Sequence, residues 1–212
     1  MTKEQKIINY YVTCNRLKNI LRTGWLDWNV QGSRIESVAE HIYGTQMLAI
    51  AMKSEYQYDI DLMKVLYMLA IHELGETIIG DLTQFQIEKK DKMIMEHEAV
   101  HSILKDLLDG EEIEQLFLEF DERKTKEALF AHYCDKLECD LQAKIYDEEN
   151  CIDLNNQENN PSFHYEDVQK CIKKGMSFSE MWLSFGQERY HYDNNFQNVS
   201  EFAKKHHLKD NI

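Results

Sequence analysis

The sequence predicts an all-α fold, and two observations carry that prediction. Among 212 residues there are only one proline and eight glycines, so few positions break a helix. Apolar residues recur at helical spacing along most of the chain, whereas the apolar–polar alternation of strands is almost absent. A chain of this length can bury a substantial core and suits one domain better than two. No internal repeat and no long linker divides it.

The expected helices follow from their caps and apolar stripes. Ser37 and Glu40 form a capping box, and Asp59 can cap the next helix, which Gly80 ends as a C-cap glycine. In chain order the helices are expected at about 3–21, from Ser37 to about Met52, from Asp59 to Gly80, 90–108, 111–120 and 125–146. Loops are expected at 22–36 and 147–161. Two or three further helices should occupy 165–206 and pack on a core formed by about 3–147.

The charge of the chain limits its partners. It carries 38 acidic and 24 basic residues, a formal net charge of −14. Such a surface repels phosphate backbones, which excludes nucleic acid as an expected partner. A small phosphorylated ligand remains compatible, because a bound cation can reverse the field inside a pocket.

The expected location is the cytoplasm. The first residues, MTKEQKIINYYV, lack the apolar core of a signal peptide. No run approaches the roughly 18 apolar residues of a membrane span. The five cysteines form no C-x-x-C motif and no even set, which favours reduced thiols over a disulfide framework.

One short motif resembles a zinc site. His97, Glu98 and His101 read as H-E-x-x-H, which on a helix places two imidazoles on one face with a glutamate between them, as in zinc metalloproteases. A peptidase of that kind also needs a third ligand, for which Glu119 or Glu122 are candidates, and an edge strand for its substrate. The motif alone is a weak signal, because a chain rich in His and Glu produces it by chance.

A second set of candidate ligands is spread along the chain. His41, His72 and Asp135 each lie on the inward face of an expected helix, and Glu73 follows His72 directly. Ionisable groups on inward faces are costly unless they are paired or bind a metal. Each also has an ordinary explanation: a hydrogen-bonded core histidine, a carboxylate paired with Lys136, or a solvated glutamate.

Their order resembles the HD-domain superfamily of metal-dependent phosphohydrolases, whose ligands are His, His-Asp and Asp on separate helices of a bundle. Four blocks extend the likeness to the branch of small 5′-deoxynucleotidases, which includes the bacterial YfbR-type enzymes and HD-domain-containing protein 2. They are LRTGW (21–25), ESVAEH (36–41), HELGETIIGDL (72–82) and CDKLECDLQA (134–143). The resemblance implies a single HD-domain helical bundle over 1–212 and one divalent ion held by His41, His72, Glu73 and Asp135. Glu73 departs from the aspartate of the family signature.

The resemblance also implies an activity: hydrolysis of deoxynucleoside 5′-monophosphates. Two imidazoles and two carboxylates suit Mn, Co, Fe, Ni or Zn, so the sequence does not identify the metal. Glu76 lies four residues after His72 and can act on the attacking water. Asp81 is the second acidic residue that the family places in its active site.

The remaining expectations concern the substrate and the assembly. Arg22 matches a family arginine that contacts the substrate phosphate, and Trp25 or Trp28 can pack on the sugar or base or be buried in the core. Family members are commonly homodimers. Two alternatives stay open: a non-catalytic HD regulator that binds a nucleotide or metal, favoured by Glu73, and a zinc peptidase at His97 and His101.

Overall fold

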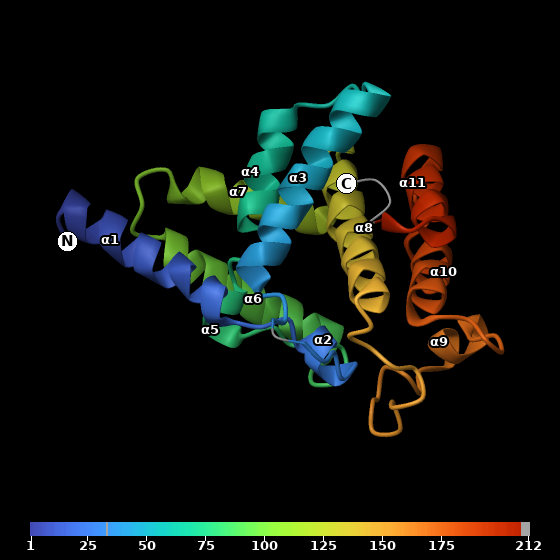
Figure 1. Ribbon diagram of the computed structural model, residues 1–212. Helices are drawn as coiled ribbons and strands as arrows, with labels where there is room; N and C mark the ends of the chain where they lie inside the picture. Colours follow the sequence, from blue (N-terminus) through green and yellow to red (C-terminus); the bar gives the residue numbers. More distant parts are fainter. Residues whose placement is uncertain (33, 209–212) are drawn as a thin grey trace. The chain divides into compact units, whose positions relative to one another are not determined.

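A computed structural model describes residues 1–32 and 34–208, and these residues fold into helices joined by turns (Figure 1). The described part contains no strand; an isolated antiparallel bridge joins Leu21 to Ser37. The all-α prediction is therefore confirmed. The chain divides into two compact units, Met1–Thr23 with Glu36–His132, and Gly24–Ile35 with the chain from Tyr133 onward.

The first unit contains most of the helices. They are α1 (Lys3–Cys14), the 3₁₀ helix η1 (Asn15–Asn19), α3 (Val38–Tyr56), α4 (Leu62–Ile71), α5 (Glu76–Ile79), α6 (Lys89–Leu104), α7 (Gly110–Glu122) and the start of α8 (Lys126–Glu148). Part of its core is a cluster from α4, α6, α7 and the turn after α4, formed by Ile71, Leu74, Val100, Leu104 and Phe117.

The caps of α3 and α4 set where these two helices begin. The predicted capping box is present: Ser37 N–H donates to Glu40 Oε2 at 2.8 Å, and Glu40 N–H donates to Ser37 Oγ at 3.4 Å. For α4 the predicted cap is wrong by two residues. Asp61 accepts the Lys64 N–H at 3.2 Å, whereas Asp59 pairs with Lys126 at 2.9 Å.

The helix expected from Asp59 to Gly80 is interrupted. It ends at Ile71, and helical geometry resumes only at Glu76. Between them the chain tightens into turns with bonds between residues three apart, such as Leu74 N to Ile71 O at 2.9 Å. Gly80, with φ +79°, ends α5 in a conformation that favours glycine. His72 and Glu73 therefore lie at a break in the helix.

The second unit contains fewer helices than the first. Besides α2 (Thr23–Asp27), whose first residue ends the first unit, and the remainder of α8, it contains α9 (Glu166–Cys171), α10 (Phe178–Tyr190) and α11 (Asn194–Lys205). The helix α2 falls where a loop was expected, and the three late helices agree with the prediction. Aromatic residues dominate the core, with Trp25, Trp28, Tyr146 and Phe178 buried together.

Two further observations concern membrane-spanning helices and the cysteines. None of the described helices combines the length and apolar character that crossing a bilayer requires. All five cysteines are free thiols.

Candidate metal centre and active site

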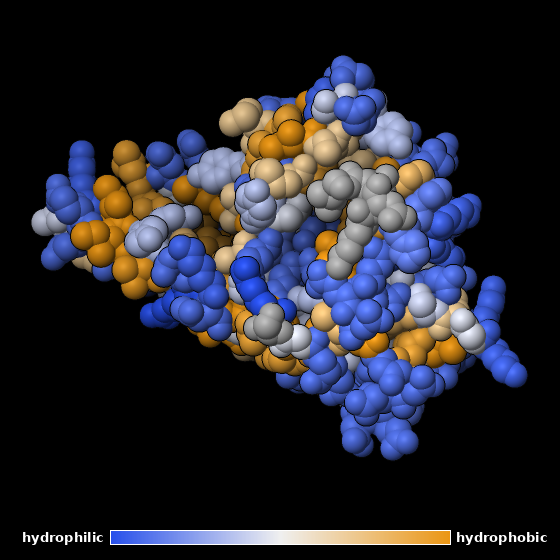
Figure 2. All heavy atoms as spheres, viewed as in Figure 1, coloured by the Kyte–Doolittle hydropathy of each residue, from blue (hydrophilic) through white to orange (hydrophobic). Residues whose placement is uncertain are grey.

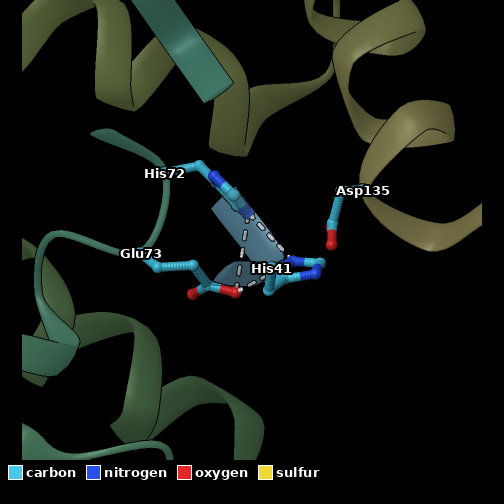
Figure 3. Close-up of side chains that lie close together, drawn as sticks. All are labelled: His41, His72, Glu73 and Asp135. Atoms are coloured by element: carbon cyan, nitrogen blue, oxygen red, sulfur yellow. Dashed lines mark hydrogen bonds and ion pairs between the residues drawn. The ribbon is translucent and has the colours of Figure 1, made fainter. Parts of the chain in front are cut away.

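Three side chains of the first unit converge at the break after α4. His41 projects from α3, and His72 and Glu73 come from the turn that follows α4 (Figure 3). His41 Nε2 lies 3.4 Å from His72 Nε2 and 3.9 Å from Glu73 Oε1, and His72 Nε2 lies 3.6 Å from the same oxygen. His41 is fully buried. The helix break allows two consecutive residues to present donors to one point.

The hydrogen bond of His72 determines which of its nitrogens can bind a cation. His72 Nδ1 lies 2.8 Å from the Leu69 carbonyl oxygen, which can only accept, so Nδ1 carries the proton. Nε2 then presents its lone pair toward His41 Nε2. A main-chain carbonyl that orients a histidine in this way is typical of metal sites.

The separations fit a single divalent ion. Ligands that bind one tetrahedral ion at about 2.0–2.1 Å lie roughly 3.3–3.4 Å from each other. The two Nε2 atoms and Glu73 Oε1 are close to these separations. Two imidazole nitrogens that face each other and a carboxylate are moreover a donor set that suits a divalent cation. The residues present therefore suit a metal ion.

Asp135, the fourth expected ligand, lies in the second unit. It is on α8, three residues after His132, and its side chain is buried (Figure 3). Lys136 Nζ lies 2.8 Å from Asp135 Oδ2. Pairing with Lys136 is the alternative to metal binding that the sequence analysis gave for Asp135. The role of Asp135 as a ligand stays a prediction.

Arg22 is brought to the cluster by the pairing of two chain segments. The Leu21–Ser37 bridge holds Arg22 beside the start of α3, where Arg22 N–H donates to the Glu36 carbonyl at 2.9 Å. Arg22 Nη1 lies 3.3 Å from Glu73 Oε1. A cation is thus placed next to the candidate metal ligands, as substrate phosphate binding would need.

Asp81 anchors the segment that carries Arg22. Thr23 N–H donates to Asp81 Oδ2, and Thr23 Oγ1 donates to the Asp81 carbonyl, both at 2.6 Å. These two bonds tie the turn after α5 to the residue next to Arg22. Sequence reasoning did not identify Thr23, because no spacing rule relates it to a residue so distant in the chain.

Glu76 is the most buried acidic side chain of this region. It is 1% exposed, and its Oε1 lies 3.3 Å from Lys92 Nζ. In the described part of the chain, its Oε2 has no hydrogen-bond partner. Burial, followed by the nearby charges of Glu73 and Asp81, raises the pKa of Glu76 well above its ordinary value. Carboxylate oxygens of Glu73, Glu76 and Glu96 lie within 4.8 Å of one another.

The sequence analysis missed Lys92 and Glu96, which α6 brings to the same place. Lys92 Nζ also lies 3.3 Å from Glu96 Oε1, one helical turn away. The i,i+4 spacing of an opposite-charge pair was the signal available, but such pairs are common on solvated helix faces.

The two tryptophans considered for substrate contact are buried. Trp25 is 3% exposed and packs against Tyr146 and Trp182, with ring centroids 5.3 and 5.2 Å apart. Trp28 packs against Phe178 at 5.2 Å. This placement favours the core alternative; contact between Trp25 and substrate stays a prediction.

The H-E-x-x-H motif does not gather ligands. His97 Nε2 lies 2.8 Å from Asp121 Oδ2, and His101 Nδ1 lies 3.0 Å from Glu114 Oε2. Glu119 and Glu122, the candidate third ligands, pair with Lys64 and Lys124. Among the described residues, no group of three convergent donors includes either histidine. The zinc-peptidase alternative therefore has no support from this geometry.

Comparison with known proteins identifies the family of this chain. The family model described as HD domain matches residues 14–177, which is well over half of the chain. The chain therefore belongs to the HD-domain family.

Within that family, several similar curated proteins are named 5′-deoxynucleotidases. The 5′-deoxynucleotidase HDDC2 of Dictyostelium discoideum is 34% identical over 67% of this chain and 78% of its own length. The 5′-deoxynucleotidase hdd1 of Schizosaccharomyces pombe is 33% identical over 68% and 74%. The human 5′-deoxynucleotidase HDDC2 is 29% identical over 68% and 70%.

Solved structures share the fold. A protein from Pyrococcus horikoshii OT3 aligns with a TM-score of 0.65 at 24% identity, covering 93% of this chain and 98% of its own. A structure from Magnetospirillum magnetotacticum MS-1, described as a predicted metal-dependent phosphohydrolase, aligns with a TM-score of 0.63 at 19% identity, covering 99% and 94%.

Proposed function

We propose that this chain is a divalent-metal-dependent 5′-deoxynucleotidase, which converts a deoxynucleoside 5′-monophosphate and water to a deoxynucleoside and phosphate. The observation that carries the proposal is the convergence of His41, His72 and Glu73 beside a buried glutamate, Glu76, and a cation, Arg22. The curated relatives named 5′-deoxynucleotidase supply the substrate class.

The proposed ligands of one divalent ion are His41, His72, Glu73 and Asp135. The first three are supported by their mutual distances, and Asp135 by its place in the order of ligands and its burial in α8. The ion is Mn, Co, Fe, Ni or Zn, since this donor set suits each of them. When bound, it supplies positive charge that makes water more acidic and neutralises phosphoryl oxygens.

The other residues of the site act on water and substrate. Glu76 takes a proton from the attacking water as the water oxygen bonds to phosphorus. The bond from phosphorus to the 5′ oxygen breaks, and this oxygen takes up a proton from solvent to leave as the hydroxyl of the deoxynucleoside. Arg22 holds the phosphate, because its planar guanidinium with five donors matches the oxygens of a phosphate. Asp81 serves the sugar or the leaving oxygen, and Trp25 stays the candidate for the sugar or base.

We further propose the setting in which the protein works. The chain functions as one HD domain over its whole length, in the cytoplasm, where its five free thiols stay reduced. It forms a homodimer. Exposed apolar side chains that gather on α1, seen at the left of Figure 2, support an interface between two copies: Ile7, Ile8, Tyr11 and Val12.

The decisive experiment is phosphate release from a panel of nucleoside and deoxynucleoside monophosphates, with Mn²⁺ or Co²⁺ added. Wild type should release phosphate and prefer deoxynucleotides. Glu76→Ala should lose about 10²–10⁴-fold in rate while retaining its metal, because loss of a general base costs about that much.

Two outcomes would change the assignment. A folded, metal-loaded wild type that releases phosphate from none of the panel would contradict the nucleotidase and favour the non-catalytic regulator. Full activity in Glu76→Ala would keep the enzyme but move the base elsewhere, with Asp81 the next candidate.

A further inference from the structure

Glu76 needs a counter-charge, and the first unit provides one that does not belong to the expected site. A carboxylate that is 1% exposed is strongly disfavoured unless a cation or hydrogen-bond donors compensate it. Lys92 Nζ lies 3.3 Å from Glu76 Oε1, and the Lys92 side chain is only 24% exposed. The pair is therefore shielded from solvent, and electrostatic interactions are stronger in such an environment than in water.

The lysine is itself held in place. Lys92 Nζ lies 3.3 Å from Glu96 Oε1, on the next turn of α6. Burial opposes the charge of Lys92, but the carboxylates of Glu76, Glu73 and Glu96 outweigh it, and the pKa of Lys92 lies above its ordinary value. Lys92 thus remains an ammonium between two glutamates.

A glycine permits the approach that makes this contact. A Cβ on Gly75, the residue before Glu76, would lie 3.2 Å from both Cα and the carbonyl oxygen of Glu96. The backbone of α6 therefore packs against the turn where Glu76 begins α5. This fixes Lys92 and Glu96 relative to Glu76 through main chain, which is more rigid than long side chains alone.

The two oxygens of Glu76 then differ. Oε1 faces the Lys92 ammonium, whereas Oε2, within the part of the chain that the structure describes, accepts no hydrogen bond. We propose that Lys92 is a positioning residue: it holds Oε1 of Glu76, so that Oε2 is the oxygen that takes the proton from the attacking water. This inference rests on the proposed function, in which Glu76 is the general base.

The test compares steady-state phosphate release by wild type, Lys92→Met, Lys92→Arg and Lys90→Met with added Mn²⁺. Lys90 lies exposed on the same helix, so Lys90→Met makes the same chemical change away from Glu76. Lys92→Met should lower kcat about 10²-fold, as expected for a misplaced catalytic group, with KM changed less than about twofold. Lys92→Arg should recover most of kcat, and Lys90→Met should match wild type.

A double-mutant cycle shows whether Lys92 acts through Glu76. In a Glu76→Gln background, Lys92→Met should cause little further loss of kcat, because the group that it positions is already gone. An equal loss in both backgrounds would overturn the inference, as would a raised KM with unchanged kcat, which would place Lys92 on the substrate phosphate.

Failure of the proposed function gives a different result. Wild type would then release no phosphate from any nucleotide. The cycle would instead be measured by thermal unfolding of wild type, Lys92→Met, Glu76→Gln and the double variant. Coupling between Lys92 and Glu76 would then show an ion pair that only stabilises the fold, and would overturn the positioning role.

Discussion

Glu73 is the residue at which this chain departs from the His-Asp signature of the family it resembles. Its extra methylene is accommodated because Glu73 lies in the turn after α4, where the backbone has left the helix. Its Oε1 reaches within 3.6 Å of His72 Nε2 and within 3.3 Å of Arg22 Nη1. One oxygen can thus face both the candidate ligand cluster and the cation expected to hold phosphate.

The residue-scale prediction concerns the metal. His72→Ala should lower bound metal at least tenfold, because it removes a ligand whose orientation the Leu69 carbonyl fixes. Glu73→Gln should also weaken binding, since a neutral amide oxygen is a poorer donor to a divalent cation, whereas Glu73→Asp should retain it. The measurement is metal content after dialysis against a dilute chelator, by atomic emission.

His97→Ala is the matched control, since it removes a histidine that pairs with Asp121 on α7. Its metal content should equal that of wild type. Metal lost from His97→Ala and kept by His72→Ala would place the ion at the H-E-x-x-H motif.

At the scale of elements, α6 makes ionic contacts with two different neighbours. Lys92 and Glu96 face the turn that carries Glu76. His97 and His101 instead pair with Asp121 and Glu114 of α7, so the motif that resembles a zinc site joins two neighbouring helices.

The turn between α6 and α7 depends on a glycine. A Cβ on Gly110 would lie 2.1 Å from the Leu104 carbonyl oxygen, a main-chain atom that cannot rotate away. Gly110→Ala should therefore reduce the free energy of unfolding by at least about 1–3 kcal/mol, the usual cost of overpacking. Chemical denaturation of the two proteins measures the difference.

Gly24→Ala is the control for that substitution. Gly24 lies in α2, and nothing is within 4 Å of the position that its Cβ would take. Alanine should be neutral there or stabilise by about 0.5–1 kcal/mol, because it lowers the entropy of the unfolded chain. Equal effects of the two substitutions would mean that the α6–α7 turn tolerates a side chain.

At the scale of the whole molecule, the fold leaves an apolar surface on α1 exposed. None of the residues of α1 is buried, although Ile7, Ile8, Tyr11 and Val12 are apolar or aromatic. A second copy of the chain would remove this surface from water.

Light scattering coupled to size exclusion tests the proposed dimer. Wild type should have twice the chain mass of 25.2 kDa. Ile8→Glu should shift the mass toward that of one chain, because it buries a charge in the interface. Phe202→Glu, at a similarly exposed position on α11, should leave the dimer intact. A wild-type mass of 25.2 kDa would contradict the homodimer.

The sequence by itself determined the fold class, the positions of most helices and the family. Helical periodicity, the Ser37–Glu40 capping box and the scarcity of proline are local properties, so one chain segment is enough to show them. The order of His41, His72, Glu73 and Asp135 likewise needs no coordinates. It was sufficient to predict a metal-dependent phosphohydrolase.

Tertiary structure decided what surrounds those residues. The break after Ile71, which presents His72 and Glu73 together, replaced a helix that periodicity extended to Gly80. Lys92 reaches Glu76 because α6 packs against the start of α5. Thr23 reaches Asp81 because the turn between η1 and α2 packs against the turn after α5. Such contacts join residues remote in the chain, and their partners are set by packing and burial, which no local spacing encodes.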